Sequence, residues 1–373
     1  MTIYLDNNAT TSMDSRVIEA MLEEFSYPGN NPSASHSLGQ EAKGRLQKAR
    51  ETIAKYLGVN REEIFFTSGG TESMNMLLHG FLSNFSSSNI ITSNVEHSSV
   101  YETLLRFAKR GHTLSFLPAG LLGAVSPQDV KAALQLSTKL IALSAVNHET
   151  GVKLDIETVA AIAQEARVPF IVDGVALMGK ERFTIPKGVS GMGFSGHKFH
   201  APKGSGFIFL RGDLPFHSLL TGGNQEYGKR AGTENLPAIV GLAKAISLLE
   251  KELPQASHRM AMLRDRLEAG LLQACTPVVV NGMGPRIANV CNVAFPGVKG
   301  EDLLIALDMH GVSASHGSAC SSGALEPSRI LREMGVPYAS ASLRFSLSRF
   351  TTEEEIDRCI KITAQLVEQL RSY

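Results

Sequence analysis

The chain has few cysteines, and they are not arranged to bind a metal or to form a disulfide framework. Only four occur in 373 residues, and none has the paired Cys-x-x-Cys spacing of zinc sites. They lie far apart, at Cys275, Cys291, Cys320 and Cys359. We therefore expect no metal site, and we expect any cysteine with a special role to be reactive rather than structural.

Other absences narrow the class of protein further. Basic and acidic residues both number 36, so the formal net charge is zero, and no basic excess points to nucleic acid or to an anionic membrane. No apolar run is long enough to cross a bilayer. The first residues lack the basic start and apolar core of a signal peptide. We expect a cytoplasmic protein that contacts neither nucleic acid nor membrane directly.

The length of the chain exceeds that of one ordinary hydrophobic core, which predicts two domains. From about residue 14 to 245, short β-rich runs alternate with amphipathic stretches. This pattern predicts a large α/β domain with a mainly parallel sheet. Residues 1–13 and 246–373 are expected to form a smaller α+β domain.

Individual elements can be placed from the hydrophobic pattern. Strands are expected at 64–67, 89–92, 140–143, 169–172, 206–210, 277–280, 289–294 and 342–347. Two separate long helices are expected at about 236–253 and 258–274, and further helices at about 301–309 and 353–371.

A lysine and an aspartate follow two of the expected buried strands. Lys198 ends the run Phe194-Ser195-Gly196-His197-Lys198, and Asp173 ends the apolar run that begins at Pro169. A lysine that forms a Schiff base and an aspartate that pairs with a pyridinium nitrogen are the groups that pyridoxal 5'-phosphate (PLP) needs most from a protein. The alternatives are a surface lysine in a turn and a helix-capping aspartate. Finding both residues after apolar strands favours the cofactor.

Several small polar residues lie where a phosphate could bind. Gly69, Gly70 and Thr71 lie between a strand and the start of a helix, where backbone N–H groups can hold phosphate, although glycine in such a turn can serve geometry alone. Ser195 and His197 could add donors beside Lys198. Thr233 lies in a glycine-rich, charged loop before a helix and could supply another contact, or the loop could be a flexible connector.

His97 and Arg344 are candidates for contact with a substrate or cofactor. His97 follows an expected strand, at the edge where α/β sheets place ligands, and could stack on a cofactor ring or move protons. Arg344 alternates with apolar neighbours in a strand and could bind a carboxylate bidentately. The alternatives are a hydrogen-bonded core histidine and an arginine that faces water.

One cysteine differs from the other three in its surroundings. Cys320 lies in a Gly/Ser-rich run from 315 to 323, where an accessible thiol could attack a substrate and retreat. The alternative is an incidental loop thiol, although exposed free cysteines are a liability. The remaining cysteines lie in apolar periodic patterns and are expected to be inert core residues.

Together these motifs resemble the cysteine desulfurases of the NifS/IscS type, which are PLP enzymes with the aspartate-aminotransferase-like fold. The resemblance extends nearly from end to end. It rests on Tyr4–Thr11, Thr67–Glu72, Glu96-His97, Ser195–Lys198, Gly222–Asn235, Gly317–Cys320, Leu325–Ser328 and Leu343–Ser346. It implies that the smaller domain carries the catalytic cysteine loop and that two subunits form a homodimer with active sites at their interface.

The resemblance also implies a role for each candidate residue. Lys198 would be the Schiff-base lysine, Asp173 the partner of the pyridinium nitrogen, and His97 the ring-stacking acid/base. Cys320 would accept the sulfur. The remaining cofactor and substrate contacts would come from Gly70, Thr71, Ser195, His197, Thr233 of the neighbouring subunit, Asn8 and Arg344.

Two positions near the cofactor depart from the family pattern. His148 stands where the family usually has an asparagine that contacts the cofactor's phenolic oxygen, and Ala176 stands where it has a glutamine near the same atom. We hypothesise that His148 fills the space left at Ala176 and donates that hydrogen bond itself. His316 also replaces a usual serine near Cys320, where a cation would favour the thiolate.

The predicted reaction converts L-cysteine to L-alanine and leaves a persulfide on Cys320. An acceptor protein would then collect the sulfur for iron–sulfur clusters, thiolated tRNA or another cofactor. Two alternatives stay open. One is a PLP-dependent lyase or aminotransferase that acts on selenocysteine or cysteine sulfinate and is indifferent to Cys320. The other is a weakly active scaffold for sulfur transfer, which the changes at His148 and Ala176 suggest.

Overall fold

The computed structural model describes residues 2–29, 31–212, 214–317 and 328–372. Its centre is a seven-stranded sheet in the order β2-β8-β7-β6-β5-β3-β4. The strands are β2 (Ile64–Thr67), β3 (Asn89–Ser93), β4 (Thr113–Leu117), β5 (Thr138–Ser144), β6 (Phe170–Asp173), β7 (Val189–Ser195) and β8 (Gly206–Leu210). Only β8 runs against its neighbours, so the mainly parallel α/β fold is confirmed.

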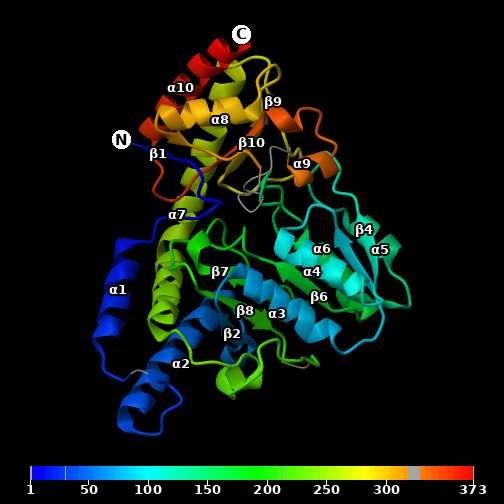
Figure 1. Cartoon of the computed structure of the whole chain (residues 1–373), viewed down its shortest axis with the longest axis vertical. Helices are drawn as coiled ribbons and strands as arrows, with labels where there is room; N and C mark the ends of the chain where they lie inside the picture. The colour runs from blue at the N-terminus through cyan, green and yellow to red at the C-terminus, as the bar shows by residue number, and fades with distance from the viewer. Residues whose placement is uncertain (1, 30, 213, 318–327, 373) are drawn as a thin grey trace.

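Apolar residues cover both faces of this sheet, because successive side chains of a strand point to opposite sides. On one face Phe65 and Ile171 pack with α3 (Gly70–Leu82) and α4 (Ser98–Ala108), which lie in front of the sheet in Figure 1. On the other face Phe66 and Phe170 join a larger cluster. That cluster includes side chains of α2 (Ser37–Leu57), α6 (Ile156–Ala166) and the first part of α7 (Leu236–Ala274).

A second body is built around a three-stranded antiparallel sheet in the order β12-β10-β9. Its strands are β9 (Val279–Val280), β10 (Val290–Ala294) and β12 (Ser342–Ser346), and its helices are α8 (Gly300–Met309) and α10 (Glu353–Arg371). The short α9 (Arg329–Glu333) packs instead with Val95 and Ala119 in a separate small cluster. The N-terminal strand β1 (Ile3–Tyr4) pairs with β11 (Val312–Ser313). Ile3 and Leu5 therefore belong to the apolar core of this C-terminal body.

The helix α7 corrects the sequence-based expectation of two helices. It runs unbroken from Leu236 to Ala274 with Pro254 inside it, and it connects the two bodies (Figure 1). A proline inside a helix costs about 3 kcal/mol through a lost hydrogen bond and a steric clash. Leu253 and Met260 are buried in the first core, and Leu267 is buried in the second. This burial on both sides of Pro254 offsets the local cost.

Two further observations concern membrane spans and metal sites. Among the described residues, no helix is long and apolar enough to cross a membrane. The described part of the chain also holds no group of three or more His, Cys, Asp or Glu side chains arranged to bind a metal ion.

Candidate active site

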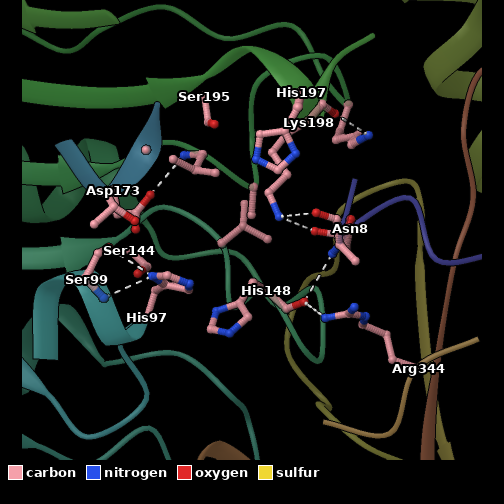
Figure 2. Close-up of a pocket in the computed structure, with 17 residues that line it drawn as sticks. Asn8, His97, Ser99, Ser144, His148, Asp173, Ser195, His197, Lys198 and Arg344 are labelled. Carbon is pink, nitrogen blue, oxygen red and sulfur yellow. Dashed lines mark hydrogen bonds between the residues drawn. The ribbon is translucent and has the colours of Figure 1, made fainter. Parts of the chain in front are cut away.

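A cavity of about 200 Å³ lies at the carboxyl edge of the central sheet. Parallel strands end at the same edge, which is where open α/β sheets bind ligands. Ser144, Asp173 and Ser195 are the last residues of β5, β6 and β7, and all three line this cavity. Figure 2 shows them facing residues from the N-terminal segment and from β12.

Besides Ala176, the cavity brings together ten of the twelve residues predicted to act in the reaction or to contact the cofactor or substrate. These are Asn8, Gly70, Thr71, His97, His148, Asp173, Ser195, His197, Lys198 and Arg344. Two others are not among them. Thr233 is exposed and does not line the cavity of its own chain, and Cys320 lies outside the described residues.

The start of α3 has the shape of a phosphate cup. Gly69 has a φ of +149°, which a residue with a side chain rarely adopts. A Cβ on Gly70 would lie 2.9 Å from Cγ2 of Val175, so only glycine fits there without displacing its neighbour. Backbone N–H groups at this helix end favour an anion. A neighbouring hollow of about 410 Å³ shares Thr71 and Ser195 with the main cavity.

His197 is held beside this cup as a neutral ring. Its Nδ1 lies 3.1 Å from the hydroxyl of Thr10. Burial, reinforced by the positive charges of Lys198 and Lys203, lowers its pKa to about 4. A neutral imidazole can still donate one hydrogen bond to an anion.

Asp173 is a buried carboxyl group at the end of β6. Its Oδ1 accepts a hydrogen bond of 3.0 Å from the backbone N–H of Val175. Burial raises its pKa, while His97, this N–H group and Lys198 act in the opposite direction. A cationic group brought near Asp173 would therefore stabilise its charged form.

Lys198 ends the short helix η2 (Gly196–Lys198), directly after β7. Its Nζ donates hydrogen bonds to the backbone carbonyls of Asn8 and Ala9, the latter at 3.0 Å. The amine thus lies between the carboxyl edge of the sheet and the N-terminal segment (Figure 2).

His97 occupies the N-cap position of α4. Its Nδ1 accepts a hydrogen bond of 3.1 Å from the backbone N–H of Ser99 and lies 2.9 Å from the Ser99 hydroxyl. Because Nδ1 accepts, the proton of the neutral ring is on Nε2. The ring of His148 lies edge-on to it, with 5.2 Å between the ring centroids.

His148 carries a buried nitrogen for which no partner exists among the described residues. This atom is Nε2, and buried polar atoms normally have a partner. Burial, followed by the charges of His97 and Arg344, lowers the pKa of the ring well below its usual value. The imidazole is therefore neutral and able to donate one hydrogen bond. Its predicted bond to the phenolic oxygen of a cofactor stays a prediction.

Arg344 comes from β12 and is almost completely buried. Its Nη2 forms an ion pair of 2.8 Å with Asp6, and its Nη1 donates a hydrogen bond of 3.1 Å to the backbone carbonyl of His148. The same carbonyl accepts a hydrogen bond of 3.1 Å from Nδ2 of Asn8. Arg344 and Asn8 are thus held in one network on the far side of the cavity from Asp173.

Two buried residues of this region were missed by the sequence reasoning. Glu96 accepts hydrogen bonds from the hydroxyls of Ser93 and Ser144, and burial raises its pKa to about 7. Lys180 lines the cavity and is 2% exposed. The signal for Lys180 was a lysine at the end of the largely apolar run from Val175 to Gly179.

The three cysteines expected in the core are indeed buried. Burial raises the pKa of Cys275 to about 11, that of Cys359 to about 12, and that of Cys291 above its usual range. These thiols are protonated at neutral pH and inert. His316 donates a hydrogen bond of 2.8 Å through Nδ1 to the backbone carbonyl oxygen of Ser342. Its predicted effect on Cys320 remains a prediction.

Comparison with known proteins agrees with the predicted resemblance. The family model of the class-V aminotransferases matches residues 3–359. Cysteine desulfurase 2 of Trichormus variabilis is 41% identical over 99% of this chain and 94% of that protein. Cysteine desulfurase NifS of Azotobacter vinelandii is 39% identical over the same shares. A solved structure described as a NifS-like protein has a TM-score of 0.92 and 34% identity, covering 99% of this chain and all of that one.

Proposed function

The chain belongs to the class-V aminotransferase family, and from that premise we propose that it is a PLP-dependent cysteine desulfurase. It removes sulfur from L-cysteine, releases L-alanine and holds the sulfur as a persulfide on Cys320. The observation that carries this proposal is the joint placement of Lys198, Asp173 and Arg344 around one cavity. These are an amine, a buried carboxyl and a carboxylate-binding guanidinium.

The residues present fit PLP. The cup at Gly70 has no room for a side chain and presents a helix N-terminus to a phosphate. Asp173 is a buried carboxyl that a protonated ring nitrogen would keep ionised. The buried Nε2 of His148 would gain a partner from an oxygen of the ring. Thr71, Ser195 and His197 complete the set of donors around the phosphate.

PLP, when bound, supplies an aldehyde that condenses with amines and a ring that takes up electrons from the substrate's Cα. The side chains of the protein bind the substrate and transfer protons. Arg344 binds the substrate carboxylate through its guanidinium, and Asn8 lies beside it in the same network. Lys198 takes up the α-proton on Nζ, and His97 is placed as the second acid/base at Nε2.

Cys320 accepts the sulfur as a thiolate. The bond between the substrate's Cβ and its sulfur breaks, and a bond forms between that sulfur and the sulfur of Cys320. L-cysteine and a thiol thus become L-alanine and a persulfide, with the two protons needed at Cα and Cβ returned by the acid/base groups. The atoms balance without an external oxidant.

The working enzyme is a homodimer in this proposal, in which Thr233 reaches the phosphate of the neighbouring subunit. The loop that carries Thr233 is anchored beside the phosphate cup, because Arg230 pairs with Glu72 of α3 at 2.8 Å. Thr233 itself is exposed on the single chain, which leaves it available to a partner. The proposed sulfur acceptor is a protein of iron–sulfur or thio-cofactor assembly, and the proposed location is the cytoplasm.

We also retain the proposed division into a large domain of residues 14–245 and a small domain of residues 1–13 and 246–373. The two separate apolar cores support it, since the N-terminal Ile3 and Leu5 pack with the C-terminal body. Along α7, however, the buried side chains from Ile246 to Met260 belong to the first core and those from Leu263 to the second, so the change in packing falls later than the proposed boundary after residue 245.

The test is an assay of L-alanine and sulfide formed from L-cysteine, with and without a thiol reductant. We expect alanine and sulfide in equal amounts when reductant is present, and cofactor absorbance in the purified protein. A Cys320→Ser variant should keep that absorbance and lose sulfide release, with Cys275→Ser as the matched control. Normal sulfide release by Cys320→Ser would favour the lyase alternative. A protein that cannot be loaded with PLP would favour the scaffold.

A further inference from the structure

A buried glutamate next to His148 bonds to a serine from the C-terminal part of the chain. The carboxylate of Glu149 accepts a hydrogen bond from the hydroxyl of Ser328, which is 179 positions away and is the N-cap residue of α9. The main chain of Glu149 is held as well. Its N–H donates a bond of 3.0 Å to the side-chain oxygen of Asn147, and its carbonyl accepts one of 3.0 Å from the side-chain amide of Asn292. The carboxylate therefore has a defined position beside His148.

The serine belongs to the two residues that flank the segment containing Cys320. Residues 318–327 lie outside the described part of the chain, and Gly317 and Ser328 lie on either side of them. A Cβ added to Gly317 would lie 3.5 Å from Cβ of Ser328, so these two residues, which we call the stem, lie side by side. Cys320 follows Gly317 by three positions, and three residues span at most about 11 Å. The position of the stem therefore limits which atoms the thiol can reach.

The chain on each side of the stem is attached to residues around the cavity. Ser315 donates a backbone hydrogen bond of 3.1 Å to Arg344 and accepts one of 2.8 Å from it. On the other side, the guanidinium of Arg329 donates hydrogen bonds to the backbone carbonyls of Asn94 and Glu96, the latter at 2.6 Å. The stem is thus held both by β12 and by the turn that leads into α4.

The contact between Glu149 and Ser328 links the stem to the predicted substrate site. Both residues are buried, with exposed fractions of 1% and 8%, and loss of either partner would leave a buried polar atom unsatisfied. Burial raises the pKa of the Glu149 carboxyl, while the bond from Ser328 acts in the opposite direction. The backbone carbonyl of the preceding His148 accepts the hydrogen bonds of Arg344 and Asn8 (Figure 2). Two consecutive residues thus contact the predicted carboxylate-binding group and the stem.

We propose that Glu149 and Ser328 are a pair of positioning residues for sulfur transfer. By holding the stem against the His148 turn, they set the distance between the Cys320 thiol and the sulfur of a substrate whose carboxylate is bound by Arg344. This inference rests on the proposed function. Neither Glu149 nor Ser328 lines the cavity, and neither is assigned a contact with substrate or cofactor.

Two measurements on the full-length, PLP-loaded protein separate sulfur transfer from the earlier steps. Exchange of the α-hydrogen of L-alanine with D2O, followed by NMR, needs the cofactor and the proton-transferring groups but no thiol. Persulfide formed on Cys320 in one turnover of L-cysteine, quantified by mass spectrometry without reductant, needs the thiol in place. In Glu149→Ala and Ser328→Ala we expect the rate of persulfide formation to fall by about 10-fold or more, because reacting atoms tolerate little misplacement. The rate of exchange should stay close to that of the wild type.

Further variants separate positioning from a loss of stability. Glu149→Gln keeps an oxygen that accepts the Ser328 hydroxyl, and it should restore most of the rate of persulfide formation. Glu149→Ala combined with Ser328→Ala should be no slower than the slower single variant, because residues that act through one shared contact are not additive. Ser126→Ala is the matched control, because Ser126 also caps a helix, α5 (Pro127–Ala133), and does not line the cavity. Where circular dichroism shows that Glu149→Ala fails to fold, Ser328→Ala carries the test.

The outcomes distinguish this proposal from the function on which it rests. If the loaded wild-type protein forms no persulfide on Cys320, the proposed function is wrong. If it does, but Ser328→Ala forms persulfide at the wild-type rate, the positioning role is overturned and the proposed function stands. Equal losses of exchange and persulfide formation would also overturn the role, since they would show that the pair acts on an earlier step.

Discussion

The two walls of the active-site cavity are held in place by different kinds of contact. The strand-edge wall is formed by His97, Ser144, Asp173 and Ser195. Asp173 and His97 bond to residues two positions away, Val175 and Ser99, and the Ser144 hydroxyl bonds to Glu96, 48 positions away. On the opposite wall, formed by Asn8, His148 and Arg344, the partners are distant in sequence. Arg344 and Asp6 are separated by 338 positions, and Asn8 and His148 by 140.

This difference indicates how the site is assembled. The strand-edge wall is complete once the central sheet forms, because its residues and their partners lie at the ends of the strands or directly after them. The opposite wall requires the N-terminal segment, the turn at His148 and β12 to come together. We therefore expect changes on the strand-edge wall to affect the chemistry, and changes on the opposite wall to affect mainly substrate binding.

The largest effect is expected at Lys198, which lies between the two walls. Lys198→Ala removes the amine that we propose takes up the α-proton and should reduce kcat by about 10³-fold or more. The rate of alanine formation from L-cysteine measures this loss. Lys139→Ala, an exposed lysine on β5, is the control and should leave the rate unchanged. A Lys198→Ala variant that forms alanine at a near-normal rate would show that Lys198 is not the base.

On the opposite wall, Arg344→Gln should weaken substrate binding. It removes a buried guanidinium, whose bonds to a carboxylate are charge-assisted and bidentate, and should raise KM for L-cysteine by about 100-fold. The absorbance of bound PLP should not change, because the variant leaves the strand-edge wall, with Asp173 and Ser195, unaltered. Loss of PLP from this variant would mean that the two walls are not independent.

A smaller effect is expected from Asp6→Asn, which keeps the shape of the side chain and removes its charge. Asp6 pairs with Arg344 at 2.8 Å, so its loss should leave the guanidinium less well oriented. Because Arg344 keeps its hydrogen bond to the carbonyl of His148, only part of its orientation is lost, and KM should rise by about 5-fold, which corresponds to about 1 kcal/mol. Steady-state kinetics at several L-cysteine concentrations measure it. A fall in KM would instead show that Asp6 competes with the substrate for Arg344.

The smallest effect concerns stability behind the strand-edge wall, at Glu96. Its pKa is raised to about 7 in the folded protein, above the ordinary value of the unfolded chain, so the folded state binds more protons between these two values. Stability from this group is full below the unfolded pKa and falls as pH rises toward 7, by at most about 1.4 kcal/mol per pH unit. Glu96→Gln should flatten this slope in urea unfolding measured at several pH values. An unchanged slope would contradict the assignment.

Much of the strand-edge wall could be predicted from sequence. The apolar runs that end in Asp173 and lead to Lys198 identify strands, and the turn at Gly69 and Gly70 is a candidate phosphate site. These features depend on a few consecutive residues. For the opposite wall, the sequence predicted which residues take part but not which of them contact each other. Nothing near Arg344 in the sequence shows that Asp6 lies beside it.

The sequence by itself determined the class of fold and the positions of most strands of the central sheet, which follow from local patterns of apolar and polar residues. It also gave the candidate reactive groups, whose roles are implied by the family resemblance. The tertiary structure alone decided that Lys180 donates a hydrogen bond to the backbone carbonyl of Lys198, that the Nε2 of His148 is buried with no partner in the described part of the chain, and that α7 continues through Pro254. Each of these depends on burial by residues far away in the chain, and burial is a property of the packed molecule rather than of any short segment.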